Sequence, residues 1–520
     1  MANQLLSNSL WLIVQKLLLL LIAFFMTPYM LRQLGTSQYG IFVLILSLTN
    51  LFGAFNTSFG QTTLRFVAAE RGVENFGHIR KIVWTCWSLN VVAVVVVGGL
   101  LVVSVPTVIT WLQIKPGDYE LIRQALLIAV LLFVVEGFFS AFQVLPMAFE
   151  RYEWHTLVAV TQSLLQVAGF VWLLSAGYGV VELVTWILVL SITFGGVKLI
   201  VAGQLHQNLF RLGNFWIAGR SRSILRFSAF TLLNHVLAII WLQIDKWLLG
   251  VLMSTSAVAL LNIPQQLSEK GHMLIHSSAQ ILMPRFSLTQ DIEKTKQLFS
   301  VSTWLMSVLS LSFFMPFALI LFDFLRLWIG PEIAEQATEV GVLILAGFSL
   351  KGAFAPYQHY LVGKNKAHIL TVQSLLSTVW AVVLGVVLIP LYGLNGAGYG
   401  FIMSNLVGFA FLVFTWCRLL VVSKGLQLLF PVVLGPMFAT CIALTVLLPL
   451  KQWVGIIDNW FILFVFGAFG SLVTMVCCLL LDRLIGGAKP ASLFVQEYLV
   501  VYLVSWLRQR KMFKSKWKET

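Results

Sequence analysis

Fourteen apolar segments of membrane-spanning length constrain this chain more than any other feature. A helix needs about 20 mostly apolar residues to cross the hydrocarbon core of a bilayer. The segments that meet this requirement are residues 9–31, 38–60, 82–105, 121–145, 156–175, 179–203, 227–250, 257–282, 298–322, 338–362, 368–390, 396–420, 427–449 and 459–482. Because 59% of the 520 residues are hydrophobic and only 10% are charged, the composition fits no soluble globular class. The sequence therefore predicts an all-α polytopic membrane protein.

Basic residues in the connecting segments predict the orientation of the chain. Loops on the cytoplasmic side of a membrane carry an excess of lysine and arginine. If the N-terminus is inside, most of the 34 lysine and arginine residues fall in inside loops or in the C-terminal tail. We therefore expect both termini in the cytoplasm. The net charge of +14 does not indicate a nucleic-acid partner, because the basic residues are scattered over short loops and the tail.

The sequence lacks the motifs of cofactor and metal chemistry. Its five cysteines lie in or at the ends of apolar segments, without the spacing of a metal site or a disulfide framework. No phosphate loop or dinucleotide-binding fingerprint is present. We therefore expect no metal, no cofactor and no direct coupling to ATP.

The second half of the chain repeats the order of features in the first half. His155 and Gln162 precede a Gly-Tyr-Gly turn, and His368 and Gln373 precede a Leu-Tyr-Gly turn. Parallel six-helix repeats are a transporter architecture that places the substrate site between the halves. The expected domains are an N-terminal six-helix lobe (1–205), a C-terminal six-helix lobe (226–425), two additional transmembrane helices (426–482), and an interfacial helix with a basic cytoplasmic tail (483–520).

Polar and charged side chains inside the predicted spans mark the candidate substrate cavity. A charge at the bilayer centre costs about 2.5–3.5 kcal/mol on insertion scales, and it usually faces a bundle interior or a hydrated space. Predicted helix 257–282 carries such a stripe near one face, formed by Asn262, Gln266, Glu269, His276 and Gln280. The candidate cavity residues are Lys16, Glu136, Asn234, Trp241, Asp245, Glu269, Lys270, His276 and Lys351.

Each candidate also has a structural interpretation. Lys351 either binds an anion in the cavity or is the buried partner of Glu136 or Glu269. The neighbours Asp245 and Lys246 are better interpreted as an interfacial pair. Long side chains near helix ends can snorkel to the surface, as expected for Lys198 and as an alternative for Lys16. Histidine titrates near neutral pH, but a lone histidine is more often a hydrogen-bonded helix contact; the candidates are His235, His272, His276 and His359.

Two short patterns resemble a known family. They are Asn8, Trp11, Pro28, Leu34-Gly35, Tyr39-Gly40 and Phe42 near the start, and Gly363-Lys364-Asn365, Ile389-Pro390, Tyr392-Gly393 and Gly396-Ala397 later. The chain resembles the bacterial polysaccharide transporters of the multidrug/oligosaccharidyl-lipid/polysaccharide (MOP) exporter superfamily, including the Wzx-type O-antigen flippases, over about residues 1–425. The resemblance implies two six-helix lobes around a central cavity. It also implies translocation of an undecaprenyl-diphosphate-linked oligosaccharide across the inner membrane, for lipopolysaccharide or another surface polysaccharide.

The chain differs in one respect from the lipid II flippases of the same superfamily. Those proteins also have fourteen helices, but they place several arginines in the cavity of the first lobe. In this chain the first predicted helix offers only Lys16, and Arg65 lies at the inner end of the second. A lipid II substrate is therefore not expected.

Two other functions remain open at this point. A cation-coupled multidrug exporter of the same fold would be favoured by a hydrophobic cavity with a single carboxylate, whereas this chain mixes Glu and Lys. A membrane glycosyltransferase or polymerase would need acids or a catalytic domain on its outer loops, which are short here. We therefore expect a transporter rather than an enzyme. Its expected partners are the lipid-linked oligosaccharide, membrane lipids, glycosyltransferases and a polysaccharide polymerase.

Overall fold

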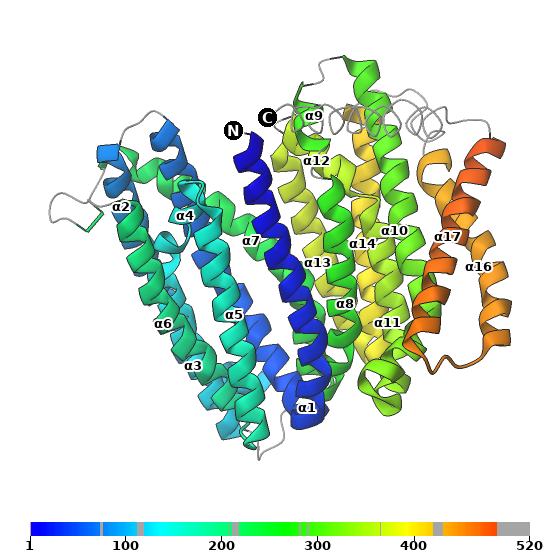
Figure 1. Ribbon diagram of the computed structural model, residues 1–520, viewed down its shortest axis with the longest axis horizontal. Helices are drawn as coiled ribbons and strands as arrows, with labels where there is room; N and C mark the ends of the chain where they lie inside the picture. Colours follow the sequence, from blue (N-terminus) through cyan, green and yellow to red (C-terminus); the bar gives the residue numbers. More distant parts are fainter. Residues whose placement is uncertain are drawn as a thin grey trace, which may run out of the picture. The chain divides into compact units, whose positions relative to one another are not determined.

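The computed structural model describes residues 2–72, 76–111, 119–206, 209–210, 218–279, 282–288, 291–364, 366–419 and 430–485. Within these ranges the regular structure is helical, without a strand (Figure 1). The helices are α1 (Ala2–Gly72), α2 (Phe76–Trp111), α3 (Tyr119–Gln143), α4 (Leu145–Ala148), α5 (Tyr152–Ser175), α6 (Val180–Leu205), α7 (Ala218–Leu252), α8 (Thr255–Ala279), α9 (Leu282–Leu288), α10 (Ile292–Ile329), α11 (Pro331–Gly352), α12 (Ala355–Gly363), α13 (Ala367–Tyr392), α14 (Leu394–Phe414), α16 (Gly435–Val454) and α17 (Trp460–Ile485). Two short π-helical segments, η2 (Thr415–Leu419) and η3 (Phe430–Leu434), complete the described elements.

The prediction of an all-α polytopic membrane protein is confirmed. Every one of the fourteen predicted spans has a helix at its place in the chain. Twelve helical segments of the described residues are long and apolar enough to cross a membrane. Fourteen predicted spans become twelve segments for two reasons. The first two spans form one continuous segment, Leu20–Arg71, and α8 is too polar to be counted.

Helix α1 contains the first two predicted spans because it kinks at a glycine instead of ending. Gly35 has φ 70° and ψ 171°, a backbone conformation that glycine adopts without steric cost. Five residues later, Gly40 lies against the start of α8, where an added Cβ would be 1.8 Å from the carbonyl oxygen of Thr255. Ser37 Oγ and Thr255 Oγ1 are 3.2 Å apart, and Asn262 donates to the Tyr39 hydroxyl at 3.3 Å. The Tyr39-Gly40 pair therefore marks a close helix contact.

Two further helix breaks lie near a proline. At the end of the fourth predicted span, 121–145, α3 ends at Gln143 and the short helix α4 follows, with Pro146 in its first turn. The tenth span is divided into α11 and α12, with Pro356 in the first turn of α12. Proline has no backbone N–H to donate and is tolerated only at the start of a helix without distortion. The two interruptions fall at matching places in the predicted repeat.

The chain divides into two compact units. Unit 1 comprises Met1–Ile263 and Ala381–Ala397, and unit 2 comprises Pro264–Trp380 and the chain from Gly398 onward. The predicted domain bounds at 205, 226, 425 and 482 stay predictions. The expected interfacial helix and basic tail lie outside the described residues, except for 483–485, which end α17.

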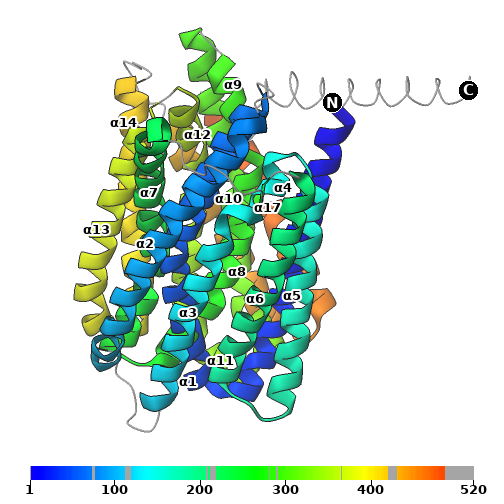
Figure 2. The ribbon, with the colours of Figure 1, turned by 90° about the vertical axis from the view of Figure 1, so that its left-hand side faces the viewer.

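In unit 1, α3 lies beside α2 and α6 (Figure 2). Asn90 of α2 is fully buried and donates to the Gly137 carbonyl at 2.8 Å and to Ser140 Oγ at 2.7 Å on α3. Apolar side chains from both helices, among them Ile82 and Phe142, form a buried cluster around this polar link. Because a buried amide costs free energy when it has no partner, these bonds fix how α2 and α3 pack.

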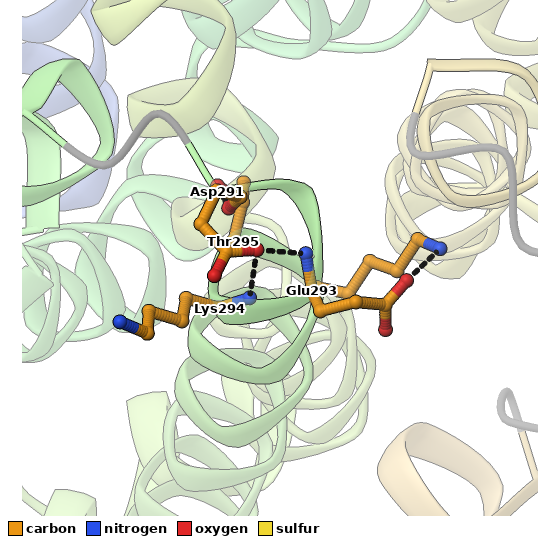
Figure 3. A network of polar contacts seen from close by, with 5 residues as sticks. Asp291, Glu293, Lys294 and Thr295 are labelled. Carbon is orange, nitrogen blue, oxygen red and sulfur yellow. Dashed lines mark hydrogen bonds and ion pairs between the residues drawn. The ribbon is translucent and has the colours of Figure 1, made fainter.

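In unit 2, the long helix α10 contacts α11, α16 and α17. It begins at Asp291, whose carboxylate accepts from the backbone N–H groups of Glu293 and Lys294, an N-cap arrangement (Figure 3). Near its other end, Asp323 is 1% exposed and lies 2.9 Å from the Lys451 ammonium of α16. The first of the two helices that follow the predicted six-helix lobe, α16, is therefore held to α10 by an ion pair.

Candidate functional site

A cluster of polar side chains lies inside unit 2, and α8 supplies three of its members. Glu269, His272 and His276 are separated by three and four residues, so they share one face of the helix. The imidazole centroids of His272 and His276 are 5.7 Å apart. All three side chains are partly buried. This face is the polar stripe that the sequence indicated, with His272 added to it.

Helices α11 and α12 supply the other two members of the cluster. The centroid of His359 on α12 lies 5.2 Å from that of His276, so the three histidines form a continuous row. Lys351, in the last turn of α11, has its ammonium 5.3 Å from the centre of the Phe348 ring, and that ring is 5.6 Å from His272. The break between α11 and α12 falls just after Lys351 and brings both helices to the cluster. We refer to Glu269, His272, His276, Lys351 and His359 as the unit 2 cluster.

The charges of the unit 2 cluster are matched in sign. The Lys351 ammonium interacts electrostatically with the Glu269 carboxylate. A charge inside a membrane protein is tolerable when such a partner offsets part of its desolvation cost. Of the two partners that the sequence left open for Lys351, Glu269 is the one that interacts with it electrostatically.

Three atoms of the cluster are available to a further polar group. Glu269 Oε1, His272 Nδ1 and His359 Nε2 are buried and have no hydrogen-bond partner among the described residues. More than about 90% of buried polar groups in proteins have such a partner. Within the described ranges, no group of three or more His, Cys, Asp or Glu side chains is arranged to hold a metal ion. The donors, acceptors and cation are instead suited to a hydrated polar ligand.

Glu136 belongs to unit 1 and is not part of this cluster. It lies on α3, where Lys198 of α6 interacts with it electrostatically and Ser191 is its neighbour. The sequence interpreted Lys198 as a snorkelling residue and named Lys351 as a possible partner of Glu136. The structure pairs Glu136 with Lys198 because α3 and α6 pack together along unit 1.

The candidates on α7 also lie in unit 1. The position of Asp245 and Lys246 at the membrane interface stays a prediction. The two residues are only 2% and 4% exposed, so they are buried within the protein. The reason is that α7 packs along α1 up to its end at Leu252. Asn234 donates to the carbonyl of Phe230 in its own helix at 2.8 Å, and Trp241 is partly buried.

The last two candidates are Lys16 and Lys270. Lys16 is on α1, but its side chain lies outside the described part of the chain, as does Gln280 of the predicted stripe. Lys270 is partly buried beside Glu269 and forms no ion pair within 4.0 Å with any described residue. The structure thus brings Glu269, His276 and Lys351 together within unit 2, whereas Glu136, Asn234, Trp241 and Asp245 belong to unit 1.

Two members of the cluster, His272 and His359, were named in the sequence only as histidines that could titrate, not as cavity residues. The signal for His272 was its spacing of four residues from His276 on a stripe that already carried Glu269. His359 had no comparable signal, because its approach to His276 depends on the break before α12. Pro356 marked that break, but its consequence for the neighbouring histidine required the fold.

The twelve long apolar helical segments of the described residues define a multi-pass integral membrane protein. A family model described as "Polysaccharide biosynthesis protein" matches residues 5–290, which is more than half of the chain. The chain belongs to this polysaccharide biosynthesis protein family. No curated protein matches it.

Solved structures show how widely this fold is shared. The lipid II flippase MurJ in an inward closed conformation is similar with a TM-score of 0.72 and 13% identity, over 92% of this chain and 99% of that one. An inward-facing multidrug resistance MATE family transporter of the MOP superfamily has a TM-score of 0.62 and 13% identity, over 76% of this chain and 93% of the other. A MOP superfamily transporter from Pyrococcus furiosus has a TM-score of 0.56 and 12% identity, over 79% and 94%. At such low identity these similarities establish the MOP fold alone.

Proposed function

We propose that the protein is a flippase for a lipid-linked oligosaccharide. It would move an undecaprenyl-diphosphate-linked glycan from the inner to the outer leaflet of a bacterial cytoplasmic membrane by alternating access, with both termini in the cytoplasm. The observation that carries the proposal is the unit 2 cluster, in which Glu269 offsets the charge of Lys351 near three histidines. The chain that holds this cluster is a member of the polysaccharide biosynthesis protein family. The fold shared with the lipid II flippase MurJ supports a lipid-linked substrate.

The cluster offers what a diphosphate requires inside a membrane protein. A lysine ammonium is a compact positive charge with three N–H donors, and neutral imidazole offers one further donor. In the absence of substrate, Glu269 offsets the charge of Lys351. A bound diphosphate would compete with Glu269 for Lys351 and accept from the imidazole N–H groups. The charge of the head group would then be distributed over several donors rather than carried alone into the membrane.

The remaining sequence candidates are kept as proposed cavity residues for mutagenesis. They are Lys16, Glu136, Asn234, Trp241, Asp245 and Lys270. We further propose that the transported glycan is destined for a surface polysaccharide such as the O-antigen of lipopolysaccharide. Glycosyltransferases would supply such a substrate, and a polymerase on the outer side would consume it.

A cation-coupled multidrug exporter is the competing function, because the MATE transporters share the fold. Proteoliposomes containing the full chain separate the two functions. One arm measures the outward exposure of a fluorescent undecaprenyl-diphosphate-linked oligosaccharide, and the other measures uptake of a cationic dye. We expect glycan exposure without dye transport, and we expect a strong loss of glycan exposure in Lys351→Glu. Dye transport without glycan exposure would overturn the proposal.

A further inference from the structure

Unit 1 contains a polar site of its own. Helices α3, α4, α5 and α6 enclose a cavity of about 150 Å³. That volume is on the order of ten times the roughly 10–15 Å³ that one ordered water requires. The polar side chains that line it are Gln143, Trp154, His155, Gln162 and Lys198. A group of phosphate size therefore fits beside a lysine and several hydrogen-bonding side chains.

Lys198 retains donor capacity toward this cavity. Its ammonium donates to Gln143 Oε1 at 3.5 Å, which is at the long limit for a hydrogen bond. It forms no ion pair within 4.0 Å with any described residue, although Glu136 interacts with it over a longer distance. Glu136 does not line the cavity. Because Coulomb energy falls with distance, an anion in the cavity that contacts Lys198 gains more from the lysine than it loses to the more distant carboxylate.

The cavity lies near the ends of its helices rather than at their middle. His155 is in the first turn of α5, and Lys198 is seven residues before Leu205, the last residue of α6. Seven residues correspond to about 10 Å of helix. The predicted orientation places this end on the cytoplasmic side, where the membrane carries acidic phospholipids.

The surface of α5 beside the cavity is apolar and exposed. Trp154, which lines the cavity, is 40% exposed, and Leu165 and Trp172 are 45% and 63% exposed. Leu165 follows Trp154 by eleven residues and precedes Trp172 by seven, so the three side chains lie on the same side of the helix. In a membrane-spanning helix such a face contacts acyl chains, and tryptophan is typical of the head-group level.

We propose that this cavity binds the phosphate of an acidic phospholipid, with the acyl chains lying along α5. Lys198 supplies the positive charge, and Gln162 and the Trp154 N–H are available as donors to phosphate oxygens. The site is a lipid-binding site in unit 1, and it does not depend on the function proposed for the unit 2 cluster.

Native mass spectrometry of the full chain in detergent tests the proposal. The probes are phosphatidylglycerol, phosphatidylcholine and inorganic phosphate, each added to the delipidated protein. We expect retention of phosphatidylglycerol in preference to phosphatidylcholine. Lys198→Gln should weaken phosphatidylglycerol binding by about tenfold, because it removes a charge-assisted hydrogen bond, and Lys198→Arg should retain most of it. Lys81→Gln, a control on α2 outside the cavity, should bind as the wild type does.

A second variant covers the case in which Lys198→Gln does not fold. Ala159→Phe places a ring in the cavity, which Ala159 lines, and keeps the lysine. It should weaken phosphatidylglycerol binding as well. Equal phosphatidylglycerol binding by the wild type and either folded cavity variant would overturn the proposal. So would equal binding of the two lipids, or displacement of phosphatidylglycerol by equimolar inorganic phosphate, which would indicate a site for the free ion.

Discussion

The Lys351 ammonium of α11 interacts electrostatically with the Glu269 carboxylate of α8, so a cation and a carboxylate offset each other within unit 2. The row of three imidazoles at His272, His276 and His359 lies in the same cluster. This relationship makes Lys351 both a structural partner and a candidate ligand for a substrate anion. The two roles have different consequences when either residue is changed.

The structural role predicts that loss of one partner lowers the amount of folded protein. Lys351→Ala leaves the Glu269 carboxylate without its cation, and an uncompensated charge is more costly than a missing pair. We expect Lys351→Ala to be less abundant in the membrane than the double variant Lys351→Ala/Glu269→Gln. Quantitative immunoblotting of membrane fractions checks this order. Equal abundance of the two variants would show that Glu269 does not depend on Lys351.

The ion pair between Asp323 of α10 and Lys451 of α16 predicts that, here too, a single variant is less stable than the matching double variant. Lys451→Ala removes the partner of Asp323, which is 1% exposed, and should destabilise the protein by about 3 kcal/mol. Lys451→Ala/Asp323→Asn should recover part of that loss, since the asparagine oxygen can still accept from the Ile457 backbone N–H, as Asp323 Oδ1 does at 3.2 Å. The unfolding temperatures of the single and the double variant, measured in detergent, check this prediction. A single variant as stable as the wild type would contradict the role of the pair.

The close approach of α1 to α8 predicts a steric effect at Gly40. A Cβ at this position would be 1.8 Å from the Thr255 carbonyl oxygen, so Gly40→Ala must displace backbone. We expect it to lower the stability by roughly 1–3 kcal/mol, as overpacking does. Gly53→Ala is the matched control on the same helix, because its Cβ meets no atom within 4 Å and alanine favours helix. Equal unfolding temperatures for the two variants would contradict the observed contact.

The sequence predicted the helices well because each membrane span must be apolar over a fixed length, a signal that is local in the chain. It predicted less about their interruptions. Gly35 kinks α1 without ending it, Pro146 marks a helix break at the end of a predicted span, and Pro356 marks one inside a predicted span. These features depend on how the neighbouring helices pack, which apolar periodicity does not specify.

The sequence likewise identified single polar residues but did not specify which of them lie together. Glu269, His276 and Lys351 were identified because a charged or polar residue inside a span is unusual by itself. The pairings of Lys351 with Glu269 and of Lys198 with Glu136 required knowledge of which helices are neighbours. His359 joined the cluster only through the break before α12, and the burial of Asp245 depends on the packing of α7 along α1.

Membrane topology can be tested at two exposed positions. The distribution of lysine and arginine predicts Tyr178, in the link between α5 and α6, on the outer side and His368, near the start of α13, on the inner side. We expect Tyr178→Cys to react with an impermeant maleimide in intact cells and His368→Cys only after permeabilisation. The background should carry Cys441→Ser, because Cys441 is exposed in the native protein. The reverse labelling pattern would contradict the orientation.

The most direct test of the flippase account is the export of glycan per molecule of folded Lys351 variant. Lys351→Glu places a negative charge where a diphosphate is proposed to bind, so it should abolish export even after correction for membrane abundance. Lys351→Arg should keep part of the activity, because arginine also binds phosphate although with a different geometry. Cell-surface glycan, divided by the amount of folded protein, is the quantity to measure. Normal export by Lys351→Glu at normal abundance would contradict the account and remove Lys351 from the substrate site.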